Sequence, residues 1–243
     1  MQIFKYTSLI SLLDVLLNER LYLHPLHMFE DQWEGVPLAS EHQALLKIGQ
    51  TTSPEGDPMR ETFSRLAELG RYTLAASCWH QADTESMAMW KIYSGTGQGC
   101  CIVAEMDWMI TTLSRDPGLT HFPVTYVNRD SHFSLDVPLP PLHHSARYKD
   151  EAYTYENEYR FVKSGPILTK RSTQSDGSIW TEPDFEASTL RAGMYVPLLL
   201  EPSNVRILLS PFLKPHELGI IKRAVSLVTR YEIQVDVSRL LIS

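Results

Sequence analysis

Short apolar segments of strand length recur along the whole chain, and the helices that separate them follow no regular strand–helix–strand order. The helical segments carry apolar residues at helical spacing, as Leu9, Leu12, Leu13 and Leu16 do near the N-terminus. Because a doubly wound sheet needs regular alternation, this order favours an α+β fold with a mixed or antiparallel central sheet and flanking helices. Predicted strands cover residues 3–7, 21–24, 72–79, 100–104, 124–127, 158–163, 195–200, 205–209 and 233–237; predicted helices cover 9–16, 59–69, 85–93, 107–114 and a segment beginning at Pro215.

The length of 243 residues is long for one domain but still allows a single core. Hydrophobic residues make up 43% of the chain and charged residues 21%, which is typical of a chain that folds without a partner. Segments near 128–148 and 165–193 show little periodicity, and we expect long irregular excursions there. The prediction is therefore a single globular domain over residues 1–243.

The net charge is −7 and the basic residues do not gather in a stripe, which argues against general attraction to nucleic acid but leaves a local nucleotide pocket open. Cys78, Cys100 and Cys101 are odd in number and lack zinc-site spacing, as expected of free thiols in a reducing compartment. No signal-peptide pattern and no apolar stretch of about 20 residues is present. We expect a cytoplasmic protein with no membrane partner and no metal site.

The densest group of ionisable side chains lies in residues 155–160, Tyr-Glu-Asn-Glu-Tyr-Arg. In an extended strand, Glu156, Glu158 and Arg160 would share one face at about 6.6 Å spacing. One interpretation is a solvent-facing charge ladder with little effect on stability. The other is a site in which two close carboxylates raise one another's proton affinity, an arginine keeps one ionised, and the pair acts as acid and base or stabilises positive charge on a sugar carbon.

Four segments together resemble a bacterial family described as domain of unknown function 2971, and the resemblance extends over most of the chain. The segments are Lys5-Tyr6, residues 29–35 (Phe-Glu-Asp-Gln-Trp-Glu-Gly), Met89-Trp90 with Tyr93 and Gly99, and residues 155–160. The chain departs from the family pattern at Glu30, where asparagine is expected, at Gln32 (proline), at Trp33 (phenylalanine) and at Tyr153 (tryptophan). These changes keep the aromatic and acidic character of the segments but remove a fixed turn from the loop.

A looser similarity connects the chain with ADP-ribosyltransferases, whose layout places a polar residue on an early strand, a serine on a second strand and Glu-x-Glu at the start of a late strand. The resemblance implies NAD as a substrate. It also implies that Glu158 holds the nicotinamide-ribose hydroxyl and stabilises an oxocarbenium-like transition state, while Glu156 helps to deprotonate the acceptor. The implied cofactor-binding residues are Lys5, Tyr6, Ser77, Trp90, Tyr93 and Arg160, and the implied substrate-binding residues are Phe29, Asp31, Trp33 and Glu34.

Two functions from different classes follow. The first is an NAD-dependent ADP-ribosyltransferase-like enzyme of defence or toxin type, with a protein or nucleic-acid acceptor. The alternative is a non-catalytic nucleotide- or protein-binding domain in a phage-defence or toxin-antitoxin system, which needs no fixed carboxylate geometry. The most informative observation is whether Glu158, Arg160, Trp90 and residues 29–35 converge on one cleft, since scattered positions would remove the site.

Overall fold

The computed structural model of the chain describes residues 1–36, 69–94, 99–128, 142–173, 177, 179–229 and 232–240. The predicted helix at 59–69 lies outside these ranges except for Leu69, and most of the predicted excursion at 128–148 lies outside them as well.

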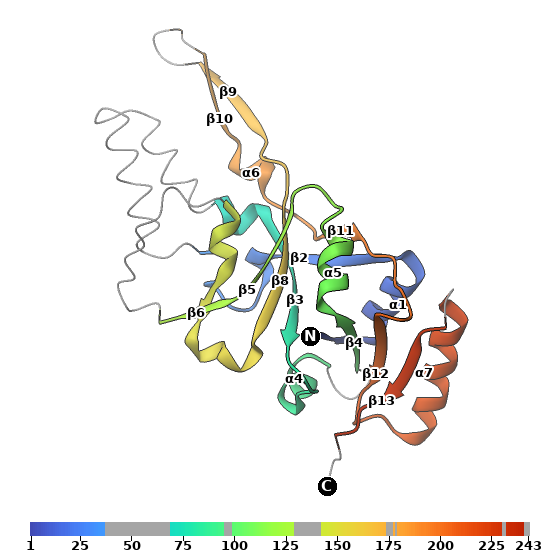
Figure 1. The fold of residues 1–243 in the computed structure, drawn as a ribbon. Helices are drawn as coiled ribbons and strands as arrows, with labels where there is room; N and C mark the ends of the chain where they lie inside the picture. Colours follow the sequence, from blue (N-terminus) through green and yellow to red (C-terminus); the bar gives the residue numbers. More distant parts are fainter. Residues whose placement is uncertain are drawn as a thin grey trace.

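A mixed sheet of nine strands forms the centre of the molecule, which confirms the α+β prediction (Figure 1). Its main path runs β11-β2-β3-β1-β4-β12-β13, with β8 beside β3 and β5 beside β8. The pairs are antiparallel except β12 and β13, which are parallel. The strands are β1 (Gln2–Ser8), β2 (Arg20–Pro25), β3 (Leu74–Gln81), β4 (Gly99–Glu105), β5 (Leu119–Pro123), β8 (Glu158–Ser164), β11 (Met194–Pro197), β12 (Val205–Leu209) and β13 (Gln234–Val237).

The main core lies between the sheet and three helices, α1 (Leu9–Asn18), α5 (Met106–Leu113) and α7 (Pro215–Val228). Each helix buries an apolar stripe in this core, and Leu12, Met109 and Ile221 are among the buried side chains. Helix α1 begins where the Ser8 hydroxyl accepts a hydrogen bond from the Ser11 amide. On the other face of β1, α4 (Met87–Tyr93) covers Phe4 and Tyr6 with Met89 and Trp90.

Strand β3 pairs along nearly its whole length with β8 on one edge, and pairs with two strands at separate places on its other edge. Its pairing with β8 runs from Leu74 to His80. On the opposite edge, Ala75 and Ala76 pair with β2, whereas His80 and Gln81 pair with β1. The strands β1 and β2 therefore diverge along β3 and leave the edge between their pairings open.

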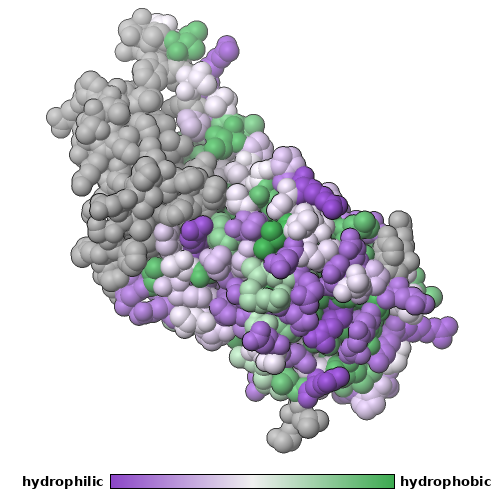
Figure 2. Space-filling model, viewed as in Figure 1, coloured by the Kyte–Doolittle hydropathy of each residue, from purple (hydrophilic) through white to green (hydrophobic). Residues whose placement is uncertain are grey.

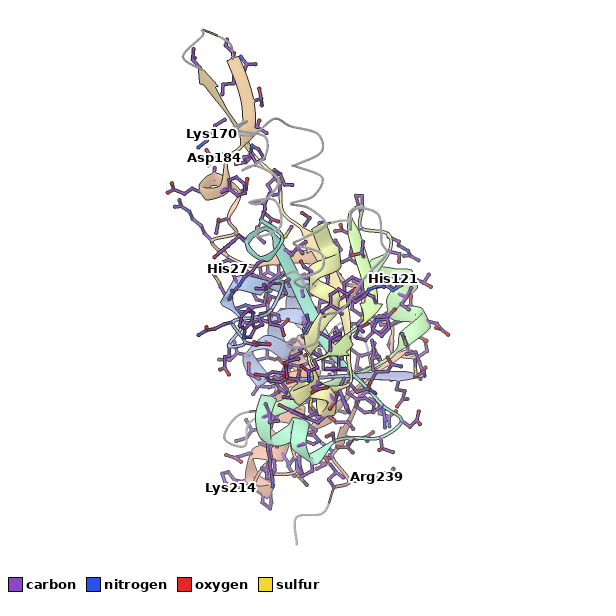
Figure 3. The ribbon with its side chains drawn as sticks, turned by 90° about the vertical axis from the view of Figure 1, so that its left-hand side faces the viewer. His27, His121, Lys170, Asp184, Lys214 and Arg239 are labelled. Carbon is purple, nitrogen blue, oxygen red and sulfur yellow. The ribbon has the colours of Figure 1, made fainter. Side chains whose placement is uncertain are left out.

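The excursion at 165–193 extends from the body of the molecule, but the prediction that it is irregular is wrong. It contains a β-hairpin of β9 (Thr169–Thr173) and β10 (Ile179–Pro183), followed by α6 (Phe185–Ser188). Figure 3 shows the hairpin standing away from the sheet, with Lys170 and Asp184 toward its base. The two strands pair in an antiparallel register, and Thr-Lys-Arg-Ser-Thr carries no apolar alternation for a pattern to detect.

The described end of the other excursion, residues 142–148, is also regular, contrary to the prediction. Strand β7 (Tyr148–Asp150) pairs in parallel with β6 (Thr125–Val127) and follows a 3₁₀ helix at Leu142–Arg147.

No helix in the described part of the chain is long and apolar enough to cross a membrane. Polar residues predominate on the described part of the face in Figure 2, with apolar ones interspersed.

Candidate functional site

A cavity of about 970 Å³ lies where β1 and β2 diverge from β3. Its wall is formed by residues of β1, β2, β3, β4 and β11, by α1 and α4, by residues 28–31 with Glu34, and by four residues from 149 to 158. Lys5 reaches across the opening, and its Nζ donates to the carbonyl oxygen of Cys78 at 3.3 Å. The volume is within the range of small-molecule sites, about 300–1,000 Å³.

Glu156 and Glu158 both lie in the cavity wall and are 2% and 6% exposed, so the prediction of a solvent-facing ladder is wrong. They do not share a strand face. Glu156 ends a 3₁₀ helix (Glu151–Glu156), Glu158 begins β8, and Asn157 joins them with a left-handed φ of 39°. The turn brings both carboxylates to one ammonium group: Lys149 Nζ lies 2.5 Å from Glu156 Oε2 and 2.8 Å from Glu158 Oε1.

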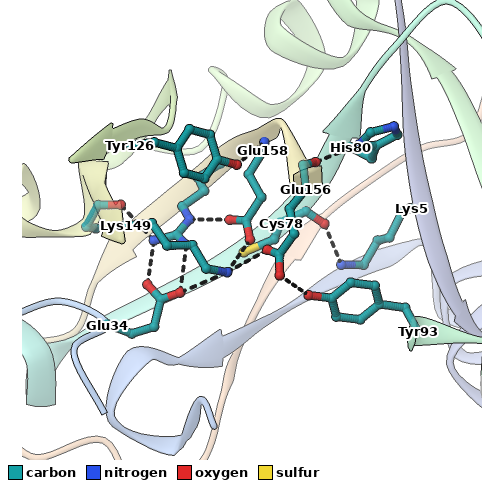
Figure 4. A network of polar contacts seen from close by, with 11 residues as sticks. Lys5, Glu34, Cys78, His80, Tyr93, Tyr126, Lys149, Glu156 and Glu158 are labelled. Carbon is teal, nitrogen blue, oxygen red and sulfur yellow. Dashed lines mark hydrogen bonds and ion pairs between the residues drawn. The ribbon is translucent and has the colours of Figure 1, made fainter. Parts of the chain in front are cut away.

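Figure 4 shows Glu34, Lys149, Glu156 and Glu158 in one polar network. Arg160 joins Glu158 to Glu34 in this network but does not line the cavity. Its Nε donates to Glu158 Oε2 at 2.6 Å, and its two terminal nitrogens bind both oxygens of Glu34 at 2.8 and 2.9 Å. Nη1 also donates to the carbonyl oxygen of Ala146 at 2.9 Å. Arg160 is fully buried, and its fixed fork holds two carboxylates in place without lining the cavity.

The loop that carries Glu34 keeps its turn although glutamine replaces the expected proline. Asp31 Oδ1 accepts a hydrogen bond from the Trp33 amide at 2.9 Å, and the Asp31 carbonyl accepts one from the Glu34 amide at 3.1 Å. Gly35 follows with a φ of +71°, which a residue with a side chain would adopt only under strain. The turn therefore directs Glu34 inward to Arg160, while Trp33 is 57% exposed.

Lys149 is the central residue that sequence reasoning missed. It also contacts Glu34 Oε1 at 3.2 Å, and its Nζ lies 4.7 Å from the ring centroid of Tyr153. The buried group thus contains three carboxylates and two cations, an excess of one negative charge when all are ionised. Nothing in the local pattern of Tyr-Lys-Asp marks Lys149. Its partners Glu156 and Glu158 lie seven and nine residues further along the chain, and the turn at Asn157 brings them to its ammonium group.

The two glutamates differ strongly in proton affinity. Burial and the neighbouring Glu158 raise the pKa of Glu156 to about 7, with Lys149 opposing the rise. Burial also acts to raise the pKa of Glu158, but Arg160, a hydrogen bond from Glu156 and Lys149 together hold that pKa well below its usual range. The Tyr93 hydroxyl donates to Glu156 Oε1 at 2.8 Å. One carboxyl can therefore exchange a proton near neutral pH while the other keeps its charge.

The structure brings most of the predicted site residues to the cavity, and it places four of them elsewhere. Lining the cavity are Lys5, Tyr6, Phe29, Asp31, Glu34, Tyr93, Glu156 and Glu158. Arg160 lies behind the wall and Trp33 faces outward. Ser77 is buried and accepts a hydrogen bond from the Trp79 indole, whereas Trp90 packs edge-on against Tyr6 at 5.0 Å and donates to Glu85. The predicted convergence therefore includes Glu158 and the 29–35 loop but not the Trp90 side chain.

The chain matches no family model, no curated protein sequence and no solved structure. The resemblance to domain of unknown function 2971 therefore stays a prediction. Among the described residues, no group of three or more histidine, cysteine, aspartate or glutamate side chains is arranged to hold a metal ion.

Proposed function

We propose that the cavity binds NAD and that the carboxylate pair catalyses transfer of its ADP-ribosyl group. The observation that carries this proposal is the pair Glu156 and Glu158, held by one ammonium group in a cavity wall with their pKa values moved in opposite directions. Two carboxyl groups with separated pKa values can divide the acid–base role and the charge-stabilising role between them.

In this reaction Glu158 is the permanent negative charge. The bond between nicotinamide and the ribose carbon breaks, and nicotinamide leaves as a neutral molecule with the bonding electron pair. Positive charge then develops on the ribose, where an ionised carboxylate stabilises it. Oε2 of Glu158 is held by Arg160, and Oε1 contacts Lys149, which has Glu34 and Glu156 as other partners. A ribose hydroxyl can therefore replace Lys149 at Oε1 without leaving the ammonium unpaired.

Glu156 is the general base for the acceptor. As the acceptor's nucleophilic atom forms its bond to the ribose carbon, it loses a proton, which Glu156 receives. A pKa of about 7 suits this transfer at neutral pH. The hydrogen bond from Tyr93 orients the carboxyl group.

The cavity also carries groups suited to the rest of a nucleotide. Lys5 forms no ion pair within the described ranges, and burial lowers its pKa, so a phosphate is a favourable partner for its ammonium group. Phe29, Tyr6 and Tyr93 add aromatic surface to the lining. The three cysteines are free, which suits a reducing compartment such as the cytoplasm, where NAD is available.

One observation favours the second function, a non-catalytic nucleotide- or protein-binding domain in a phage-defence or toxin-antitoxin system. All four carboxylate oxygens of Glu156 and Glu158 already have partners: Tyr93, Lys149 twice and Arg160. A network this complete can stabilise the cavity wall without taking part in a reaction.

NAD should raise the melting temperature of the protein and should be split in the same sample. Saturation at about 100 times the dissociation constant corresponds to a stabilisation of about 2.7 kcal/mol. Melting is followed by scanning calorimetry and released nicotinamide by chromatography. Stabilisation with nicotinamide release supports the transfer reaction, and stabilisation without release supports the binding domain. The absence of both effects rejects NAD as the ligand of the cavity and with it the transfer reaction.

A further inference from the structure

A row of aromatic rings lines a second part of the cavity wall. Tyr22 and His24 lie two residues apart on the same face of β2, and Tyr195 lies directly opposite Tyr22 on β11. The ring centroids are 5.2 Å apart for Tyr22 and Tyr195, 6.0 Å for Tyr22 and His24, and 5.4 Å for His24 and Phe29. All four rings line the cavity. We call Tyr195, Tyr22, His24 and Phe29 the aromatic row.

The row keeps its rings accessible although the same strand buries its other side chains. Leu23 is fully buried on the opposite face of β2, whereas Tyr22 is 37% and Tyr195 46% exposed. The planes of Tyr22 and Tyr195 meet at 57°, so the two rings form an open corner rather than a closed stack. A flat ligand laid on one ring would meet the other with its edge, and both arrangements are attractive for aromatic systems.

Tyr22 is held in position without being covered. Its hydroxyl accepts a hydrogen bond from the Gly193 amide at 3.2 Å. A Cβ atom at Gly193 would lie 2.1 to 2.3 Å from three atoms of the tyrosine side chain, so only glycine allows the ring this place. A ring that is both exposed and fixed loses little conformational freedom when a ligand binds to it.

The charges beside the row disfavour a phosphate there. Arg20 is stacked over Tyr195 at 3.7 Å and is paired with Asp14 at 2.8 Å, and Glu30 and Asp14 add acidic groups to the lining. The lysines in the described lining are Lys5 and Lys149, and Lys149 is shared among three carboxylates. A neutral flat group therefore fits the row, and an anionic group fits Lys5.

We infer that the aromatic row is a nucleobase-binding subsite, on which a nucleotide stacks its base while its phosphates turn toward Lys5. The inference rests on the proposed function only in assigning a nucleotide to the cavity. It adds the residues that recognise the base, and it does not depend on whether the glycosyl bond is broken.

The test compares the binding of AMP and ribose 5-phosphate by titration calorimetry. Tyr22→Ala should weaken AMP binding about tenfold or more, because one stacked ring is lost, and should leave ribose 5-phosphate affinity within about twofold. Gly193→Ala should weaken AMP binding as well, since the new methyl group displaces the Tyr22 ring. Tyr72→Ala is the matched control, because Tyr72 is a 40% exposed tyrosine that does not line the cavity.

Equal AMP affinity in Tyr22→Ala and Tyr72→Ala would overturn the inference, and so would a wild-type protein that binds AMP no better than ribose 5-phosphate. Circular dichroism of each variant verifies that the fold is retained. If AMP binding depends on Tyr22 but NAD is never split, the transfer reaction is rejected and the subsite stands.

Discussion

Replacing Arg160 with methionine should lower the free energy of unfolding by about 3–5 kcal/mol, because two buried carboxylates lose their cation. Arg160 is 0% exposed and forms ion pairs with both Glu34 and Glu158. Methionine fills a similar volume but offers these carboxylates no hydrogen-bond donor. Urea unfolding followed by circular dichroism at pH 7.5 measures the difference.

Arg20→Met is the matched control, since it removes an arginine from a carboxylate at the surface. Arg20 and Asp14 are 38% and 28% exposed, and loss of a pair that solvent screens should cost far less than loss of the buried Arg160. Equal effects of the two replacements would mean that the buried network contributes no more than a surface pair. The effect at Arg160 should also shrink in acid, where protonation relieves the unpaired carboxylates.

Glu158→Gln should reduce nicotinamide release from NAD by about 100- to 1,000-fold, the usual effect of removing one preorganised charge-stabilising group. Glutamine keeps the size of the side chain but cannot stabilise positive charge on the ribose. Since the lost interaction belongs to the transition state, NAD affinity should change far less than the rate. Single-turnover release at saturating NAD separates the two quantities.

The control for this rate effect is Asp116→Asn, which makes the same chemical change in an ion pair with Lys163 away from the cavity lining. It should leave the rate near that of the wild-type protein. A Glu158→Gln variant that is folded and releases nicotinamide at the wild-type rate would exclude Glu158 from the chemistry.

Local patterns predicted much of the fold. The apolar stripe of α1 and the buried strands β3, β4 and β12 follow from periodicity, since nearly every side chain of β4 is buried. The predicted strand at 72–79 begins two residues before β3, because residues 71–73 continue a helical turn. Strand β5 was missed, and its pairing with β8 depends on residues some forty positions away.

The candidate site was predicted only where its residues are close in sequence. Glu156, Glu158 and Arg160 form one dense segment. The loop with Glu34 was predicted only from the family resemblance. Lys149 could not be predicted, because its contacts depend on the left-handed turn at Asn157. Pairing of Tyr22 with Tyr195 was equally hidden, since strand register between distant segments is a tertiary property.

Ser77 was predicted to line the cavity, and the structure places its side chain elsewhere. Its neighbour Cys78 lines the cavity and its carbonyl meets Lys5, whereas the Ser77 hydroxyl binds the Trp79 indole in the core. Adjacent residues of a strand face opposite sides, and the sequence alone does not tell which side faces the cavity.

Glu156 and Glu158 differ in proton affinity although one lysine holds both: Glu156 exchanges a proton near pH 7, and Glu158 keeps its charge there. Carbon-13 NMR of glutamate labelled at the side-chain carboxyl tests this difference most directly, with Glu156→Gln and Glu158→Gln providing the assignments. The account predicts one signal with a midpoint near pH 7 that is lost in Glu156→Gln, and a Glu158 signal that stays ionised from about pH 5 to pH 9. Two signals that titrate together at about pH 4.3, as free glutamates do, would contradict this difference in proton affinity.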